Sequence, residues 1–357
     1  MRVRMGFTDQ YGTTMTARQA TFLPLDYQPP RWLPDGHSQT IYPALLGRRP
    51  SVEFRRETWD TPDGDFVDVD WLVAPPAAEK SPPAPEGWVE TPLVVLFHGL
   101  EGGSGSHYAR TLMREVETRG WRGVIPHFRS CSGRMNRAPR FYHSGDSTEV
   151  DWILQRLRAN TSGPIFTAGV SLGGNVLLRW LGEREGHAAQ VVSAACAISA
   201  PLDLRAGGLA LSHGFNMVYT RNFLGTLKKK ALVKLDQYPG LYDRHLMMAA
   251  RDLGEFDHVV TAPLHGYRSA FDYYTRASSK PILPAVEVPT LVINARNDPF
   301  QPANVLPSQD DVGRYVQLLQ PANGGHVGFM SGPFPGGMTW MPLTVLDYFR
   351  QFLPSAA

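Results

Sequence analysis

The segment Gly169-Val170-Ser171-Leu172-Gly173 contains a serine whose neighbours suit it for nucleophilic chemistry. It directly follows the apolar run 164–168 and begins a stretch with helical patterning, which predicts that Ser171 lies in a sharp strand-to-helix turn. Side chains at positions 169 and 173 would collide in such a turn, and glycine removes their Cβ atoms. The turn would hold Ser171 in a strained backbone conformation with its hydroxyl exposed above the sheet. Outside a strand–turn–helix context, the same pattern would indicate only a glycine-rich turn.

A nucleophilic serine needs a base, and the base needs an acid that orients it. Two later apolar runs, 290–294 and 315–319, have the pattern of strands. Asp298 lies in the turn after the first run, and His326 lies in the glycine-rich loop after the second. The chain order serine, acid, histidine, with both partners on loops after strands, is typical of enzymes with this turn. The predicted triad is therefore Ser171, Asp298 and His326.

Each partner has an alternative interpretation. Asp298 precedes a proline and could serve only to start a turn. Asp310 and Asp311 lie further along the loop or in the next helix and are alternative acids. His326 could be a surface histidine, but of the 11 histidines it alone has the position expected after the last strand.

An attacked carbonyl develops a negative oxygen that needs hydrogen-bond donors. The apolar run 93–97 ends in His98-Gly99-Leu100-Glu101-Gly102-Gly103, where Gly99 allows the backbone to approach the serine closely. The expected donors are the backbone N–H groups of Leu100 and Leu172. His98 is expected to form structural hydrogen bonds rather than to act as a second base. Glu101 would either shape the mouth of the pocket or be solvated.

Three other polar motifs have less specific interpretations. The loop 128–133 is expected to support the serine turn by packing, with Cys131 buried and inert. The segment 142–146 is expected to cap a helix that begins near residue 148. The basic run 228–230 is interpreted as a solvated helix face.

The elements around these motifs alternate between strand and helix. Strands are predicted at 51–58, 66–73, 93–97, 123–126, 164–168, 191–199, 290–294 and 315–319, and helices at 109–118, 148–157, 174–181 and 343–352. Such alternation indicates an α/β fold with a mostly parallel sheet and helices on both faces.

One long segment interrupts the alternation. Residues 203–284 have helical patterning rich in Met and aromatic side chains, and an insertion at the carboxyl edge of a sheet would form a cap. The predicted division is an α/β core of residues 51–202 and 285–357, with a helical cap of residues 203–284. The proline- and aromatic-rich segment 1–50 cannot be helical over much of its length and is expected to pack on the core through Trp32 and Tyr42.

Composition excludes several classes of protein. With 357 residues, 43% of them hydrophobic, the chain can bury a sizeable core, and a net charge of +2 gives no reason to expect a nucleic-acid partner. Two cysteines give neither a disulfide framework nor metal-ligand spacing, and no metal or organic cofactor is expected. No run could span a bilayer, and the first 19 residues lack the apolar core of a secretory signal. The chain is therefore predicted to be soluble and cytoplasmic.

A set of short motifs together resembles the YheT-like family of α/β-hydrolase fold esterases. They are residues 36–40, 98–102, 128–133, 142–146, 169–175, 261–266 and 324–329. The resemblance runs from about residue 20 to the C-terminus, and Ser130 stands where glycine would be expected. It implies an α/β-hydrolase fold and a serine esterase, with lipid-type esters discussed for eukaryotic relatives. Carried over by position, it assigns the same triad of Ser171, Asp298 and His326.

The predicted function is hydrolysis of a carboxylic ester, with an apolar acyl group, through an acyl-enzyme on Ser171. The expected partner is a small-molecule or lipid-like ester. One alternative keeps this site but transfers the acyl group to an alcohol or lipid acceptor, or acts as a lipid-ester lipase. Another is a ligand-binding protein that retains the fold without the chemistry.

Overall fold

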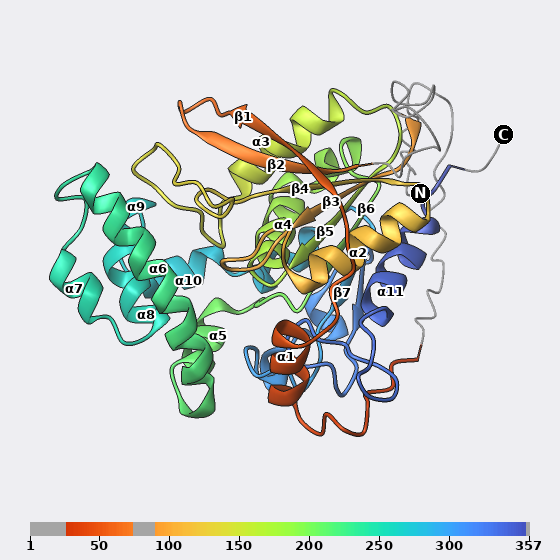
Figure 1. Cartoon of the computed structure of the whole chain (residues 1–357). Coiled ribbons are helices and arrows are strands. Elements are labelled where there is room, and N and C mark those ends of the chain that lie inside the picture. The colour runs from red at the N-terminus through yellow and green to blue at the C-terminus, as the bar shows by residue number, and fades with distance from the viewer. Residues whose placement is uncertain (1–25, 74–89, 355–357) are drawn as a thin grey trace, which may run out of the picture.

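The computed structural model describes residues 26–73 and 90–354, which are arranged around a central eight-stranded sheet (Figure 1). The strand order is β1-β2-β4-β3-β5-β6-β7-β8. Their bounds are β1 Phe54–Asp60, β2 Phe66–Leu72, β3 Leu93–Phe97, β4 Arg122–Pro126, β5 Ile165–Val170, β6 Ala194–Ile198, β7 Thr290–Ile293 and β8 Val316–Leu319. β1 pairs antiparallel with β2, and β2 with β4, whereas β3 to β8 form a parallel sheet. The predicted α/β class is confirmed.

Helices cover both faces of this sheet because its parallel strands are apolar on both sides. Along β3, Val95 packs into one buried cluster and the next residue, Leu96, into another on the opposite face. The first cluster includes side chains of α3 (Ser147–Arg158) and α4 (Leu172–Arg184). The second includes those of α2 (His107–Thr118) and α11 (Trp340–Arg350). The carboxyl ends of the parallel strands are left free to carry the site loops.

Between β6 and β7 the chain forms helices only, and we refer to residues 203–284 as the cap segment. Its α-helices are α5 Leu204–Leu211, α6 Met217–Gln237, α7 Arg244–Ala249, α8 Leu253–Phe256, α9 Ala262–Leu264 and α10 Ala270–Ala277. A π-helical stretch, Asp257–Thr261, joins α8 to α9. The segment has a buried cluster of its own, formed among others by Leu224, Met247 and Phe256. In Figure 1 it projects to one side of the sheet.

Near the N-terminus, residues Gly36–Leu45 form helix α1, which the proline content did not predict. Asp35 begins the helix: its carboxylate accepts a hydrogen bond from the Ser38 N–H, and the Ser38 hydroxyl accepts one from the Asp35 N–H. The hydrogen bonds of this capping box stabilise the start of the helix despite the nearby prolines. Before the helix, the Trp32 ring lies 4.7 Å from that of Tyr42. The expectation for residues 1–25 falls outside the described residues.

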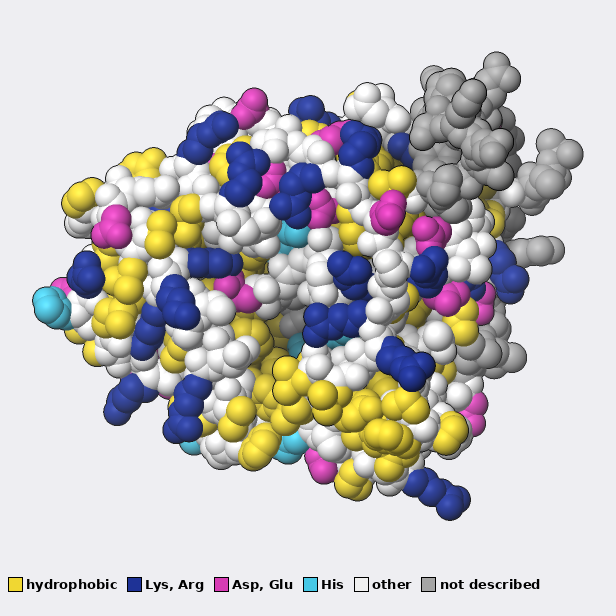
Figure 2. All heavy atoms as spheres, in the orientation of Figure 1, with side chains coloured by type: hydrophobic (Ala, Val, Ile, Leu, Met, Phe, Trp, Pro, Cys, Tyr) yellow, Lys and Arg dark blue, Asp and Glu magenta, His cyan; other side chains and the backbone are white. Residues whose placement is uncertain are grey.

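Helix α1 has three buried residues, of which Gln39 and Thr40 are polar and Pro43 is apolar. Gln39 and Thr40 are buried, whereas Leu45 and Leu46 are 73% and 69% exposed. Figure 2 shows hydrophobic side chains gathered on the surface over α1. Because buried polar groups need hydrogen-bond partners, the inner face of this helix is expected to form specific hydrogen bonds with the core. No helix among residues 26–73 and 90–354 is long and apolar enough to cross a bilayer.

Candidate active site

Ser171 occupies the turn between β5 and α4 with backbone angles φ 54° and ψ −120°. This left-handed φ is strained for a residue other than glycine. The flanking glycines make the turn possible, because a Cβ at Gly173 would lie 2.3 Å from the Phe97 carbonyl oxygen and one at Gly169 would lie 2.5 Å from that of Gly173. The Ser171 N–H donates to the Ile198 carbonyl on β6 at 2.8 Å, which fixes the turn against the neighbouring strand.

A continuous hydrogen-bonded chain joins the three residues predicted as the triad. His326 Nε2 lies 3.0 Å from Ser171 Oγ, and His326 Nδ1 lies 2.8 Å from Asp298 Oδ2. With Nδ1–H donating to the carboxylate, Nε2 is free to accept the serine proton. Asp298 is buried, and its other oxygen accepts the Phe300 N–H at 2.8 Å.

The alternative acids have other surroundings. Asp310 is exposed, and Asp311 accepts hydrogen bonds from the N–H and hydroxyl of Ser308. Asp298 is therefore the acid that contacts the His326 ring, which also stacks on Phe300 at a centroid separation of 4.0 Å.

Helix α1 holds the loop that carries His326. The Gln39 side-chain oxygen accepts the Gly324 N–H at 2.7 Å, and Thr40 Oγ1 accepts the His326 N–H at 2.8 Å. Gln39 also accepts a hydrogen bond from the side-chain amide of Asn297 at 3.0 Å, which ties the histidine loop to the loop of Asp298. Sequence reasoning did not identify Gln39 and Thr40 as site residues. The signal available in the sequence was that both residues lie within 36–40, one of the motifs that resemble the YheT-like family.

Hydrogen bonds on both sides of Leu100 hold the loop after β3 in place. The Gly99 N–H donates to the Tyr108 hydroxyl at 2.8 Å, and the Gly99 carbonyl accepts the Gly102 N–H at 2.9 Å. A Cβ at Gly99 would lie 3.2 Å from the Ser171 Cβ, so this loop approaches the serine closely. Within the part of the chain that the structure describes, the N–H groups of Leu100 and Leu172 donate to no other group. Both residues line the pocket beside Ser171.

His98 has the structural role that its position predicted. Its Nδ1 lies 2.8 Å from the Gly99 carbonyl, and its Nε2 accepts the Phe128 N–H at 3.0 Å. Complete burial lowers the pKa of His98 to about 3, so the ring stays neutral at physiological pH.

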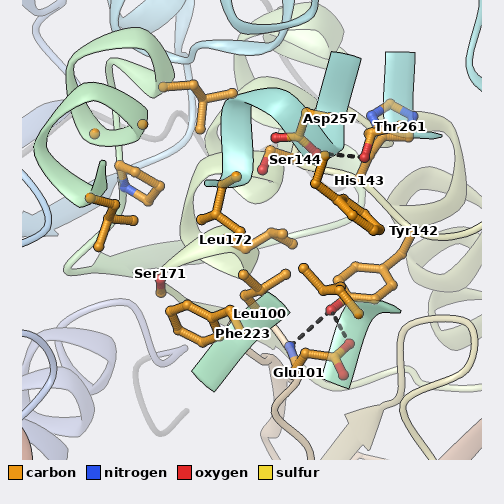
Figure 3. A pocket seen from close by; sticks show the side chains of 18 of the residues that line it. Leu100, Glu101, Tyr142, His143, Ser144, Ser171, Leu172, Phe223, Asp257 and Thr261 are labelled. Atoms are coloured by element: carbon orange, nitrogen blue, oxygen red, sulfur yellow. Dashed lines mark hydrogen bonds between the residues drawn. The ribbon is translucent and has the colours of Figure 1, made fainter. Parts of the chain in front are cut away.

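The pocket lies between the loops after the parallel strands and the cap segment (Figure 3). Its apolar lining includes Leu204, Leu211, Phe223, Leu227, Leu253, Phe256 and Phe300. Asp257 of the π-helical stretch also lines it, accepting hydrogen bonds from Thr261 Oγ1 at 2.5 Å and the Tyr274 hydroxyl at 2.7 Å. Burial raises the pKa of Asp257 to about 6. Sequence reasoning did not single out Asp257 because nothing local distinguishes it from a helix-capping aspartate.

The interpretation of the basic run 228–230 as a solvated face was wrong for two of its three residues. Lys230 lines the pocket and its Nζ lies 2.7 Å from Glu101 Oε1. Lys228 Nζ donates to the Met248 carbonyl at 2.8 Å. Lys229 is exposed, as predicted. The error has a physical cause, since contacts between the cap and the core are not visible in local sequence.

The segment 142–146, which was expected only to cap a helix, also contributes to the pocket. Asp146 is at the N-cap position of α3, but its side chain makes no capping hydrogen bond and pairs instead with Arg140. Tyr142, His143 and Ser144 line the pocket. Cys131, which was predicted to be buried and inert, lies next to this region and is only half-buried. Desolvation of its thiol still raises the pKa to about 12, which agrees with an inert thiol. No cluster of His, Cys, Asp or Glu suited to a metal ion occurs in residues 26–73 and 90–354.

Comparison with known proteins places the chain in a family. Residues 92–333 match the model of the alpha/beta hydrolase fold. The chain belongs to the α/β-hydrolase fold family. Within that family it is 37% identical to the protein named "Putative esterase YheT" of Escherichia coli (strain K12), over 92% of this chain and 94% of YheT. The predicted membership of the YheT-like α/β-hydrolases is confirmed.

Two further matches share less sequence with this chain than YheT does. Phospholipase ABHD3 of Mus musculus is 29% identical over 92% of this chain and 78% of that protein. The solved structure of the Pyrococcus furiosus esterase PF2001 superposes with a TM-score of 0.50 and 16% identity, covering 85% of this chain and 92% of that one. At that identity the superposition supports the fold alone.

Proposed function

We propose that this α/β-hydrolase cleaves carboxylic esters with an apolar acyl group, using Ser171 as nucleophile, His326 as base and Asp298 as the acid that orients the base. The observation that carries the proposal is the unbroken hydrogen-bonded chain from Ser171 through His326 to Asp298, with distances of 3.0 and 2.8 Å. It starts at a serine held in a strained turn.

The proposed reaction has two steps. His326 takes the hydroxyl proton as Ser171 Oγ attacks the ester carbonyl, and the N–H groups of Leu100 and Leu172 bind the resulting oxyanion. His326 then gives the proton to the departing alcohol, which leaves an acyl group on Ser171. Water, activated by His326, hydrolyses this acyl-enzyme. Asp298 stabilises the imidazolium in both steps.

The pocket supports an apolar acyl group, because its cap-segment wall is built mainly from leucine and phenylalanine side chains. We propose that residues 203–284 act as a cap over it. The relatives' names include a phospholipase and a monoacylglycerol lipase, which makes lipid-type esters the class to test first.

The proposal is tested with a panel of p-nitrophenyl esters of increasing acyl length. Ser171→Ala and His326→Ala should each lower kcat on the order of 10⁵-fold or more, because triad members act as a unit. Asp298→Asn should lower it by about 10⁴-fold, whereas Asp310→Asn should match the wild type. Wild-type rates in folded Ser171→Ala would overturn the assignment of the nucleophile.

A further inference from the structure

A charged pair lies in the pocket wall beside the proposed oxyanion site. The Glu101 side chain is only 10% exposed, and its Oε1 lies 2.7 Å from Lys230 Nζ. Glu101 directly follows Leu100 in the loop after β3, whereas Lys230 comes from α6 of the cap segment. The pair therefore joins the cap segment to the loop that carries a proposed oxyanion donor.

Tyr142 fixes the same loop by two hydrogen bonds, which Figure 3 shows as dashed lines. Its hydroxyl accepts the Glu101 N–H at 2.8 Å and donates to Glu101 Oε1 at 2.9 Å. Glu101 has a left-handed φ of 56°, a conformation that a residue with a side chain adopts only when its surroundings hold it there. Glu101 thus sits where both its backbone and its carboxylate are constrained.

The negative charge of Glu101 can affect the proposed oxyanion, because Glu101 and Ser171 line the same pocket. An uncompensated carboxylate in the pocket that Ser171 also lines would disfavour a developing oxyanion by like-charge repulsion. The Lys230 ammonium neutralises this carboxylate at short range. Cys131 Sγ is near both groups, at 3.9 Å from Glu101 and 3.7 Å from Lys230, but burial raises the pKa of its thiol to about 12, so it is uncharged.

Helix α6 is docked by a second lysine one turn further on. Lys234 is fully buried, and its Nζ donates to the carbonyl oxygens of Asn136 and Ala138 at 2.7 and 2.9 Å. The two lysines lie on the same face of α6, as their spacing of four residues requires. Seating of α6 on the core therefore brings Lys230 to Glu101.

We propose that Lys230 is a positioning residue for the oxyanion site: it holds the Glu101 side chain and cancels its charge, so that seating of the cap completes the site. This inference rests on the proposed ester hydrolysis and adds to it a role for the cap in the chemical step. Lys230 and Glu101 would not touch the reacting atoms; they act through the loop and the local charge.

The test compares Lys230→Met with Lys229→Met, the exposed neighbour on the same helix. Lys230→Met should lower kcat for a p-nitrophenyl ester by about 10-fold, less than the 10²–10³-fold cost of removing an oxyanion donor outright. KM should change little, and Lys229→Met should match the wild type. Lys230→Arg, which keeps the charge, should retain most of the activity.

Two further measurements separate a charge effect from a merely structural one. In the double variant Glu101→Gln/Lys230→Met, kcat should recover toward the wild-type value, because the uncompensated carboxylate is gone. An alkyl trifluoromethyl ketone, which forms a tetrahedral oxyanion on the serine, should bind Lys230→Met about 10-fold more weakly, in parallel with kcat. The matching alkyl methyl ketone, bound as the unreacted ketone, should bind equally to both.

Several outcomes would overturn the inference. Equal kcat and equal trifluoromethyl ketone affinity in Lys230→Met and Lys229→Met would remove any role for Lys230, and a change in KM alone would make it a substrate contact. A double variant no better than Lys230→Met would exclude charge neutralisation. If Lys230→Met does not fold, the Glu101→Gln/Lys230→Met variant, compared with Glu101→Gln, gives the same decision. Wild-type turnover that Ser171→Ala abolishes would support the proposed function whichever result Lys230 gives.

Discussion

The backbone N–H of His326 donates a 2.8 Å hydrogen bond to the hydroxyl of Thr40, a residue 286 positions earlier in the chain. The proposed catalytic histidine is thus held not only by its own loop but by helix α1. Gln39, the preceding residue, accepts the Gly324 N–H two positions before the histidine. Helix α1 therefore fixes the loop that carries the His326 ring at two points, the Gly324 N–H and the His326 N–H.

Replacing Thr40 by valine should slow the chemical step with little effect on binding. Valine keeps the shape of threonine but can neither accept the His326 N–H nor donate to the Gly36 carbonyl, and each buried group left without its partner costs about 1–3 kcal/mol. We expect kcat to fall by about 10-fold and KM to stay near its wild-type value, measured with the best ester of the panel. Thr40→Ser should restore activity, and an equally impaired serine variant would argue against the hydrogen bond.

Replacing Gly173 by alanine should destabilise the protein strongly. Its Cβ would lie 2.3 Å from the Phe97 carbonyl oxygen and 2.5 Å from that of His98, both of which are backbone atoms that cannot move aside cheaply. We expect a loss of about 3 kcal/mol or more in the free energy of unfolding, measured by urea denaturation. Gly105→Ala is the matched control, because a Cβ at Gly105 would meet no heavy atom within 4 Å. Equal stability of the two variants would contradict the close packing between the Ser171 turn and the end of β3.

Asp257 should make stability depend on pH in a predictable direction. Its pKa is raised by burial from 3.8 to about 6, so the folded state binds a proton more tightly than the unfolded state. The corresponding stabilisation is complete below pH 3.8 and is lost as the pH rises through 6, by up to about 3 kcal/mol. Asp257→Asn should lack this loss, so its unfolding free energy relative to the wild type should increase between pH 4 and pH 7. A difference that stays constant over this range would show that Asp257 does not titrate as described.

The parts of the fold that depend on local pattern could be predicted from the sequence. The apolar run Leu93–Phe97 forms β3 with those same bounds. The turn itself explains Gly169, whose Cβ would meet the Gly173 carbonyl, whereas Gly173 is required by the end of β3, because its Cβ would meet the Phe97 carbonyl. The predicted acid and base follow β7 and β8 because chain order in a parallel sheet determines which loops meet at its carboxyl edge.

The features that the sequence did not reveal depend on contacts between distant segments. Lys230 is indistinguishable from Lys229 in the sequence, yet one pairs with Glu101 and the other is exposed. Likewise, Gln39 acquires its role only because α1 packs beside the histidine loop. Local periodicity reports which face of an element is apolar, but it does not report which polar side chain meets a partner across the molecule.

The central claim, that Ser171 is a nucleophile activated by His326, is tested most directly by covalent labelling with an alkyl fluorophosphonate followed by intact-mass measurement and peptide mapping. Ser171 Oγ displaces fluoride from phosphorus, and its proton passes to His326. We predict one adduct per chain, located on Ser171, absent from Ser171→Ala and formed far more slowly by His326→Ala. A folded wild-type protein that forms no adduct, or an adduct that persists in Ser171→Ala, would contradict this claim.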